Sequence, residues 1–97
     1  MALALYPRTE LAKDSGMTDD GSGFAGMALA HNARTRSEVD SVLKEAEAAG
    51  AMILTAARET FWGGYAGTFT DPDGFAWEVA WNPNFTLTDD GALILPD

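Results

Sequence analysis

The segment "FAWEVAW" (Phe75–Trp81) alternates large and small side chains along its whole length. Large side chains stand at the odd positions and small ones, with a single carboxylate, at the even positions: Phe75, Trp77, Val79 and Trp81 against Ala76, Glu78 and Ala80. Successive side chains of a strand point to opposite faces of a sheet. The same alternation runs through residues 26–31 of the predicted strand Phe24–His31, and through Tyr65–Thr70. The chain therefore predicts a sheet with a bulky face that packs on a helix. Its small face would either line a cavity or be approached closely by another backbone.

The helix that would cover the bulky face is predicted from "TRSEVDSVLKEAEAAG". Thr35 and Glu38 form a capping-box pattern, in which a hydroxyl and a carboxylate satisfy backbone donors at a helix start. Gly50 stands where a helix often ends in a left-handed residue. Between them, apolar residues recur at intervals of three and four and form one stripe: Val39, Val42, Leu43, Ala46 and Ala49. We expect a helix over Arg36–Ala49.

The remaining segments complete an α+β chain with the order β-α-β-β-β from Phe24 onward. Ala51–Ala57 reads as a strand, and Asp71–Gly74 has the proline and glycine of a type I turn before the last strand. Before this unit, Ala2–Tyr6 reads as an extra N-terminal strand, and "RTELAKDSG" as one helical turn with Thr9 as its cap.

Composition and charge narrow the classes of protein. The chain has 97 residues, of which 46% are hydrophobic, which suits a single domain over residues 1–97. Fifteen Asp and Glu against six Lys and Arg give a net charge of −9, which argues against nucleic acid as a partner. There is no cysteine, no signal-peptide pattern and no apolar run near the roughly 20 residues of a membrane span. We expect a cytoplasmic protein without a membrane partner.

The pair of segments "FWGGYAGTFT" and "DPDGFAWEVAWNP" resembles the second module of the vicinal oxygen chelate superfamily. That superfamily contains glyoxalases, ring-cleaving dioxygenases, and fosfomycin- and bleomycin-resistance proteins. The resemblance covers Phe24–Pro83 as one βαβββ module, and Ala2–Tyr6 resembles the last strand of a preceding module. Because the family builds a curved mixed sheet around a pocket from two modules, it implies that a second copy completes the sheet in a homodimer. Otherwise the chain would be a remnant.

The resemblance also singles out Glu78, which matches the glutamate that ligates a metal in metal-dependent members. The position matching a second ligand is Gly26, which has no ligand atom, and His31, the one histidine, points to the opposite face by parity. We therefore expect no complete metal site and no cofactor. A hard cation held by oxygen ligands stays open. Four other roles also stay open for Glu78: a general base, an anchor for a cationic ligand, a solvated group at an open sheet edge, or the partner of an arginine such as Arg58 in an ion pair.

Three further residues are candidates for ligand binding beside Glu78. Trp62, in a glycine-rich loop, would either stack on a ligand or plug the end of the sheet. Tyr6 and Thr68 share the small face by parity. The expected function is a small-molecule binding protein of the glyoxalase/bleomycin-resistance type that lacks a complete metal site. The alternatives are a metal-dependent lyase or dioxygenase with ligands shared between chains, or a structural remnant without ligand. Catalytic residues, and whether the chain is an enzyme, stay undefined.

Overall fold

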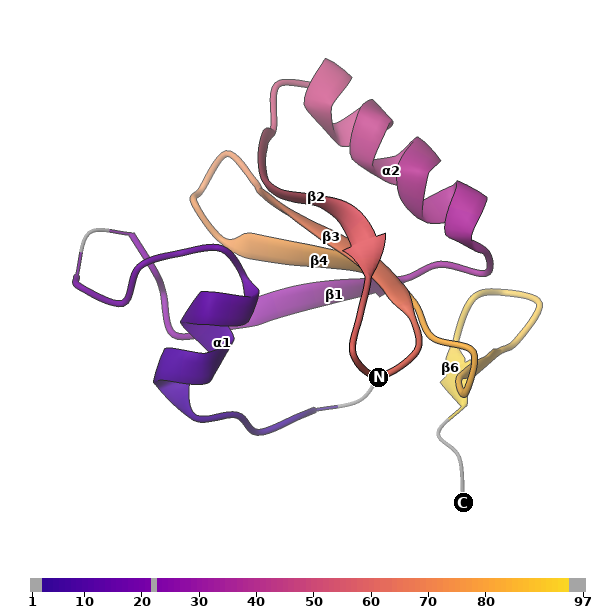
Figure 1. Cartoon of the computed structure of the whole chain (residues 1–97). Coiled ribbons are helices and arrows are strands. Elements are labelled where there is room, and N and C mark those ends of the chain that lie inside the picture. Colours follow the sequence, from indigo (N-terminus) through magenta and orange to yellow (C-terminus); the bar gives the residue numbers. More distant parts are fainter. Residues whose placement is uncertain (1–2, 22, 95–97) are drawn as a thin grey trace.

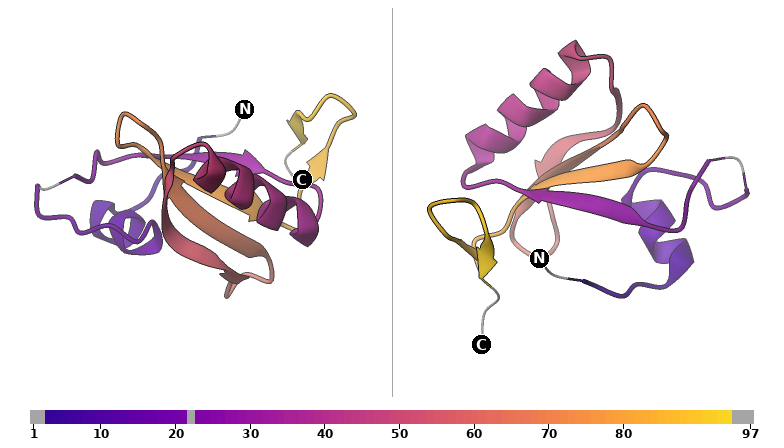
Figure 2. Two further views of the ribbon diagram at one scale, coloured as in Figure 1. Left: turned by 90° about the horizontal axis from the view of Figure 1, so that it is seen from above. Right: turned by 180° about the vertical axis from the view of Figure 1, so that it is seen from behind.

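The computed structural model describes residues 3–21 and 23–94, and it has the predicted α+β architecture (Figure 1). Four strands form one mixed sheet in the order β1-β4-β3-β2, in which only the β1–β4 pair is parallel. A two-stranded hairpin, β5–β6, stands to one side of it (Figure 2). The elements are α1 (Arg8–Asp14), β1 (Ala28–Asn32), α2 (Arg36–Ala48), β2 (Met52–Glu59), β3 (Tyr65–Thr70), β4 (Ala76–Trp81), β5 (Thr86–Leu87) and β6 (Leu93–Ile94).

Helix α2 begins and ends through the signals that the sequence carries. The Thr35 hydroxyl accepts a hydrogen bond from the Glu38 backbone N–H at 3.1 Å, which confirms the cap. Gly50 has φ +103°, and the Ala51 N–H donates to the Ala46 carbonyl at 3.0 Å. This left-handed ending closes the helix at Ala48, one residue before the predicted end.

The core lies between α2 and the bulky face of the sheet, as the alternation predicts. Val39 of α2 and Val79 of β4 are completely buried. Gly67 allows the helix to come close, because a Cβ there would lie 2.6 Å from Leu43 Cδ1. Residues that complete this core are Ala33, Val42, Ile53, Ala57, Tyr65, Phe69 and Trp81.

The turn into β4 is tied down by one carboxylate. The Asp71 carbonyl accepts from the Gly74 N–H at 3.0 Å, as in the predicted turn, and its side chain accepts from the N–H groups of Asp73 and Phe75. Trp77 Nε1 donates to Asp71 Oδ2 at 2.9 Å. This indole bond and the backbone donors hold the pKa of Asp71 below its ordinary value. The Trp77 ring stacks on Phe69, with centroids 6.3 Å apart.

The N-terminal part of the chain differs from the prediction. Residues 3–7 form no strand, and Ala2 lies outside the described residues. The helix that follows them has two turns rather than one, and it begins after Pro7, so Thr9 is not its cap. Figure 1 shows α1 and α2 on opposite sides of the sheet. The chain itself thus covers part of its small face, where we expected only a neighbouring polypeptide.

Strand β1 begins four residues later than predicted because the chain before it wraps around Arg8. The Arg8 guanidinium lies 5.2 Å from the centre of the buried Phe24 ring, and its Nη2 donates to the Phe24 carbonyl. Gly26 adopts φ +80°, and a Cβ there would lie 2.3 Å from Arg8 Nη1. The bend that makes room for this arginine is incompatible with an extended strand.

Candidate functional site

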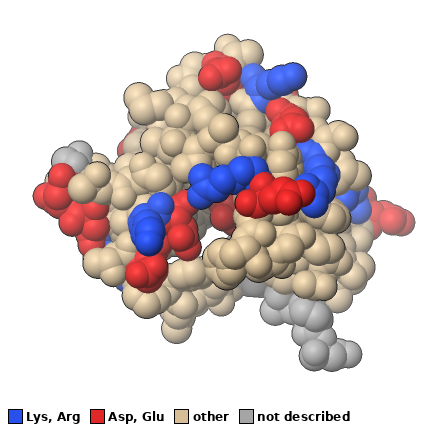
Figure 3. All heavy atoms as spheres, viewed as in Figure 1, with Lys and Arg blue, Asp and Glu red and all other residues tan. Residues whose placement is uncertain are grey.

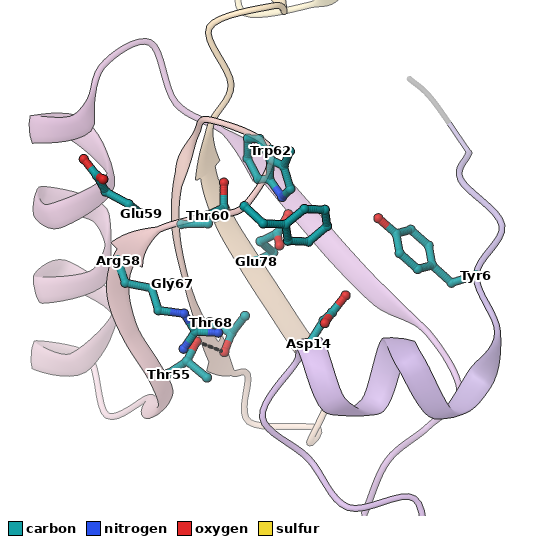
Figure 4. A pocket seen from close by; sticks show the side chains of 12 residues that line it. Tyr6, Asp14, Thr55, Arg58, Glu59, Thr60, Trp62, Gly67, Thr68 and Glu78 are labelled. Carbon is teal, nitrogen blue, oxygen red and sulfur yellow. Dashed lines mark hydrogen bonds between the residues drawn. The ribbon is translucent and has the colours of Figure 1, made fainter.

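A cavity of about 180 Å³ lies between the small face of the sheet and the N-terminal segment with α1 (Figure 4). Its walls come from β2, the β2–β3 loop, β3, β4, the end of α1 and the segment before α1. The four residues predicted to bind a ligand all line it: Tyr6, Trp62, Thr68 and Glu78. Tyr6 is 58% exposed and lies in an irregular segment. It was placed on the small face because a strand was predicted there, and that reason does not hold, since residues 3–7 form no strand.

Glu78 is the half-buried carboxylate of this cavity. It lies on β4 between Ala30 of β1 and Thr68 of β3, neither of which offers it a charge. Burial raises the pKa of Glu78, and the negative charge of Asp14 raises it further. Among the described residues no ion pair joins Glu78 to Arg58. The predicted alternative of an Arg58 pair is therefore wrong in this structure.

Asp14 was missed by the sequence reasoning. It is the last residue of α1, and its carboxylate lines the same cavity as Glu78. Strand parity could not have found it, because its position depends on how α1 packs against the sheet. The contact that fixes this packing joins the Thr68 hydroxyl to the carbonyl of Ser15, which directly follows α1.

Two threonines form a short hydrogen-bonded chain in the cavity wall. Thr55 Oγ1 and Thr68 Oγ1 lie 2.7 Å apart, and Thr68 Oγ1 donates to the Ser15 carbonyl at 3.2 Å. Each hydroxyl has one proton. If Thr68 gives its proton to Ser15, Thr55 must give its own to Thr68. The Thr55 hydroxyl has then used its proton, so it can only accept a hydrogen bond from any further group. Thr68 is 4% exposed, and its hydroxyl is bonded to Thr55 and Ser15.

Arg58 lines the cavity because β2 is irregular. Its pairing with β3 shifts register between Ile53 and Thr55 and again between Thr55 and Arg58. Thr55 pairs with Thr68 and Arg58 pairs with Ala66, so both side chains belong to the small face although they are three residues apart. Strict alternation would place them on opposite faces. An extra residue in one strand is what re-aims side chains at a bulge.

The aromatic part of the cavity lies in the loop between β2 and β3. The Trp62 ring is half-buried and folds back over Gly64, where a Cβ would lie 1.8 Å from its Cζ3 and 2.5 Å from the Trp81 carbonyl oxygen. Phe61 beside it is 96% exposed. Trp62 thus lies against the end of the sheet and also lines the cavity (Figure 4). This position is compatible with both predicted roles, plugging the end of the sheet and stacking on a ligand.

The donor set does not make a metal site within one chain. No group of three His, Cys, Asp or Glu able to hold an ion occurs among the described residues. His31 pairs with Val79, so it belongs to the helix-facing side of the sheet, opposite to Glu78, as parity predicts, and it is exposed. Gly26 precedes β1, and the β1 residue beside Glu78 is Ala30. Glu78 and Asp14 therefore have no imidazole partner.

A βαβββ sheet with one helix on its bulky face and a cavity on its small face defines the class of fold. A sequence profile of the Glyoxalase/Bleomycin resistance protein/Dioxygenase superfamily matches residues 6–79. The chain belongs to this superfamily, as its strand and turn motifs predict. None of the helices in the described part of the chain has the length and apolar character that a membrane span needs.

Solved structures support the same assignment. A glyoxalase-related enzyme from Fulvimarina pelagi shares 35% identity and a TM-score of 0.72, over 95% of this chain and 66% of its own. A glyoxalase/bleomycin resistance protein/dioxygenase family enzyme from Burkholderia phytofirmans PsJN shares 26% identity and a TM-score of 0.58, over 75% of this chain and 54% of its own. At 19% identity, a family member from Nocardioides shows the fold alone, with a TM-score of 0.56 over 79% of this chain and 52% of its own.

This chain spans between half and two thirds of the length of these structures. The search among curated proteins gave no match.

Proposed function

We propose that the chain is a small-molecule binding protein of the glyoxalase/bleomycin-resistance type, without a complete metal site, that takes its ligand on the small face of the sheet. The observation that carries this proposal is the cavity in which the unpaired Glu78 carboxylate shares a wall with Trp62. The Fulvimarina pelagi structure is described as a glyoxalase-related enzyme, and its 35% identity supports a ligand site of the same general kind.

The energetics of Glu78 favour a ligand. A partly buried carboxylate without a charged partner loses hydration that the protein does not replace. A ligand with an N–H donor would replace it, and Trp62 would contribute a flat apolar surface. At about 180 Å³ the cavity is smaller than the roughly 300–1,000 Å³ of sites for drug-sized molecules. The proposed ligand is therefore a small organic compound.

A thermal-shift screen followed by ligand-observed NMR tests the proposal on the full chain. We expect stabilisation by small compounds that carry a donor next to an apolar or aromatic group. Both Glu78→Gln and Trp62→Ala should weaken this binding, whereas Glu45→Gln, which removes an exposed carboxylate from α2, should leave it unchanged. If no compound binds, or if the compounds bind both cavity variants as tightly as the wild type, the proposal fails and the structural-remnant alternative is favoured.

We also propose that the working form is a homodimer in the cytoplasm. The outer edge of β1 has no strand partner within the described residues, and Met27 and Leu29 beside it are 45% and 36% exposed. An unprotected strand edge with apolar side chains favours association. Sedimentation should show a dimer that Leu29→Lys weakens, while Ser37→Lys, at an exposed position of α2 away from both edges of the sheet, serves as control. A wild-type monomer at tens of micromolar would contradict the dimer.

The metal-dependent alternative would need ligands from a second chain, because Glu78 has no imidazole beside it. Metal analysis of the purified protein decides this alternative. Stoichiometric metal that Glu78→Ala removes would support it and would overturn the proposal of a binding protein without a metal site.

A further inference from the structure

Charges of opposite sign face the cavity from different elements, and the protein neutralises neither. Arg58 lines it from β2, whereas Glu78 on β4 and Asp14 on α1 line it with carboxylates. Within the described part of the chain, the ion pairs are Arg8–Asp19 and Arg36–Glu59. Glu59 of β2 also lines the cavity, but Arg36 already pairs with its carboxylate. In Figure 4 the Arg58 side chain enters on the β2 side, and Glu78 and Asp14 lie toward α1. On the face drawn in Figure 3, acidic and basic side chains lie next to one another at several places on the surface.

The neutral polar groups of the wall divide into donors and acceptors. Thr60 Oγ1 accepts a hydrogen bond from the Gly64 N–H at 3.0 Å, so its own proton is free to donate. The Thr55 oxygen, in contrast, is left as an acceptor by its bond to Thr68. The cavity thus offers donors from Arg58 and Thr60, and it offers acceptors from Thr55 and from the carboxylates without an ion pair, Glu78 and Asp14.

We propose that this cavity recognises a small zwitterion, a compound of amino-acid size with one ammonium and one carboxylate group. The ammonium would lie against Glu78 and Asp14, and the ligand carboxylate would lie against Arg58 and Thr60. This inference rests on the proposed function, because it takes the cavity to be a ligand site.

Single charges fit the cavity less well than a zwitterion. A simple amine would leave Arg58 without a partner, and a simple acid would leave Glu78 and Asp14 facing each other. A simple acid would also enter a protein whose net charge is −9. Charge-assisted hydrogen bonds at both ends are the contacts that discriminate most strongly in such a site. The small volume fits a chain of a few carbons between the two groups.

Matched probes of equal chain length test the inference by calorimetric titration and NMR of the full chain. The series consists of 3-aminopropanoate, 4-aminobutyrate, 5-aminopentanoate and 6-aminohexanoate, each compared with the n-alkylamine and the n-alkanoate of the same length. We expect one aminoalkanoate to bind at least tenfold more tightly than both of its singly charged counterparts. Arg58→Gln should abolish its advantage over the amine, and Glu78→Gln its advantage over the alkanoate. Lys44→Gln and Glu45→Gln on α2 remove the same charges away from the cavity and should change neither ratio.

The outcomes separate this inference from the proposed function. If amines bind as well as aminoalkanoates and Arg58→Gln has no effect, the zwitterion is wrong although the cavity still binds ligands. The same holds if only uncharged aromatic compounds bind. If no probe and no compound of the wider screen binds, both proposals fail together.

Discussion

Replacing Gly64 by alanine tests whether the Trp62 ring lies where the structure has it. Gly64 has no left-handed backbone angle, so the substitution adds a methyl group without changing the preferred conformation. That methyl carbon would lie 1.8 Å from Trp62 Cζ3 and 2.5 Å from the Trp81 carbonyl oxygen. The ring can swing out toward solvent, but the carbonyl belongs to β4 and pairs opposite Tyr65, so the backbone must also shift.

The size of the effect follows from these two contacts. Inserting a methyl group into packed surroundings costs about 1–3 kcal/mol, and a clash with backbone favours the upper part of that range, about 2–3 kcal/mol. A domain of this size has a free energy of unfolding of roughly 5–15 kcal/mol. Because 1 kcal/mol moves the midpoint of a small domain by about 4–8 °C, we expect Tm to fall by roughly 10–20 °C.

Thermal unfolding followed by circular dichroism measures this change, and Gly23→Ala is the matched control. Gly23 also lacks a left-handed angle, and a Cβ there meets only Met17 Cε at 3.7 Å, so its Tm should hardly move. In a Trp62→Ala background the ring contact is gone, and Gly64→Ala should cost about 1 kcal/mol less than in the wild type. Equal costs in both backgrounds, or no cost at all, would refute the placement of Trp62 over Gly64.

Three further substitutions test the cap, the core and the cavity carboxylate. Thr35→Ala removes the acceptor of the Glu38 N–H and should lower the free energy of unfolding by about 1 kcal/mol in a urea titration. Val79→Ala loses two buried carbons and leaves a void, so the same titration should show a loss of about 2.5 kcal/mol. Because the pKa of Glu78 is raised on folding, the charged form of this carboxylate opposes folding. Glu78→Gln should therefore raise Tm at pH 8, and this gain in Tm should shrink as the pH falls toward 4.5. A gain independent of pH would contradict the burial of that carboxylate.

Local signals were sufficient for α2, β3 and β4, but not for the end of β2. Thr35 and Gly50 fix the ends of the helix through contacts within a few residues, and Asp71–Gly74 fixes the turn in the same way. The face of each residue in β3 and β4 follows from parity, because these strands pair without register shifts. Such features depend on near neighbours, and a sequence displays near neighbours directly.

The cavity depends on contacts between distant segments, and there the sequence was less informative. Asp14 reaches the site because α1 packs against the sheet through the Ser15–Thr68 bond, which spans 53 residues. Arg58 reaches it because β2 continues to Glu59, beyond the predicted end at Ala57, and because irregular pairing of β2 places Arg58 on the small face. The predicted strand at Ala2–Tyr6 was wrong because an apolar run shows only that residues can be buried, and Leu3 and Leu5 are about 90% exposed here.

The small face of the sheet is closely covered at its alanine and threonine positions but stays partly open at Glu78. The side chains of Ala76, Ala80 and Thr68 are short enough for neighbouring backbone to cover them, and each is at most 4% exposed. Glu78 is the one long side chain among the even positions of β4, and it is only half-buried. A long charged group on such a face prevents complete coverage, because closing over it would remove the remaining water from the carboxylate. Where alanine and threonine allow α1 to approach the sheet, Glu78 therefore keeps a space open next to it, and the same carboxylate supplies a charge on which the proposed ligand site depends.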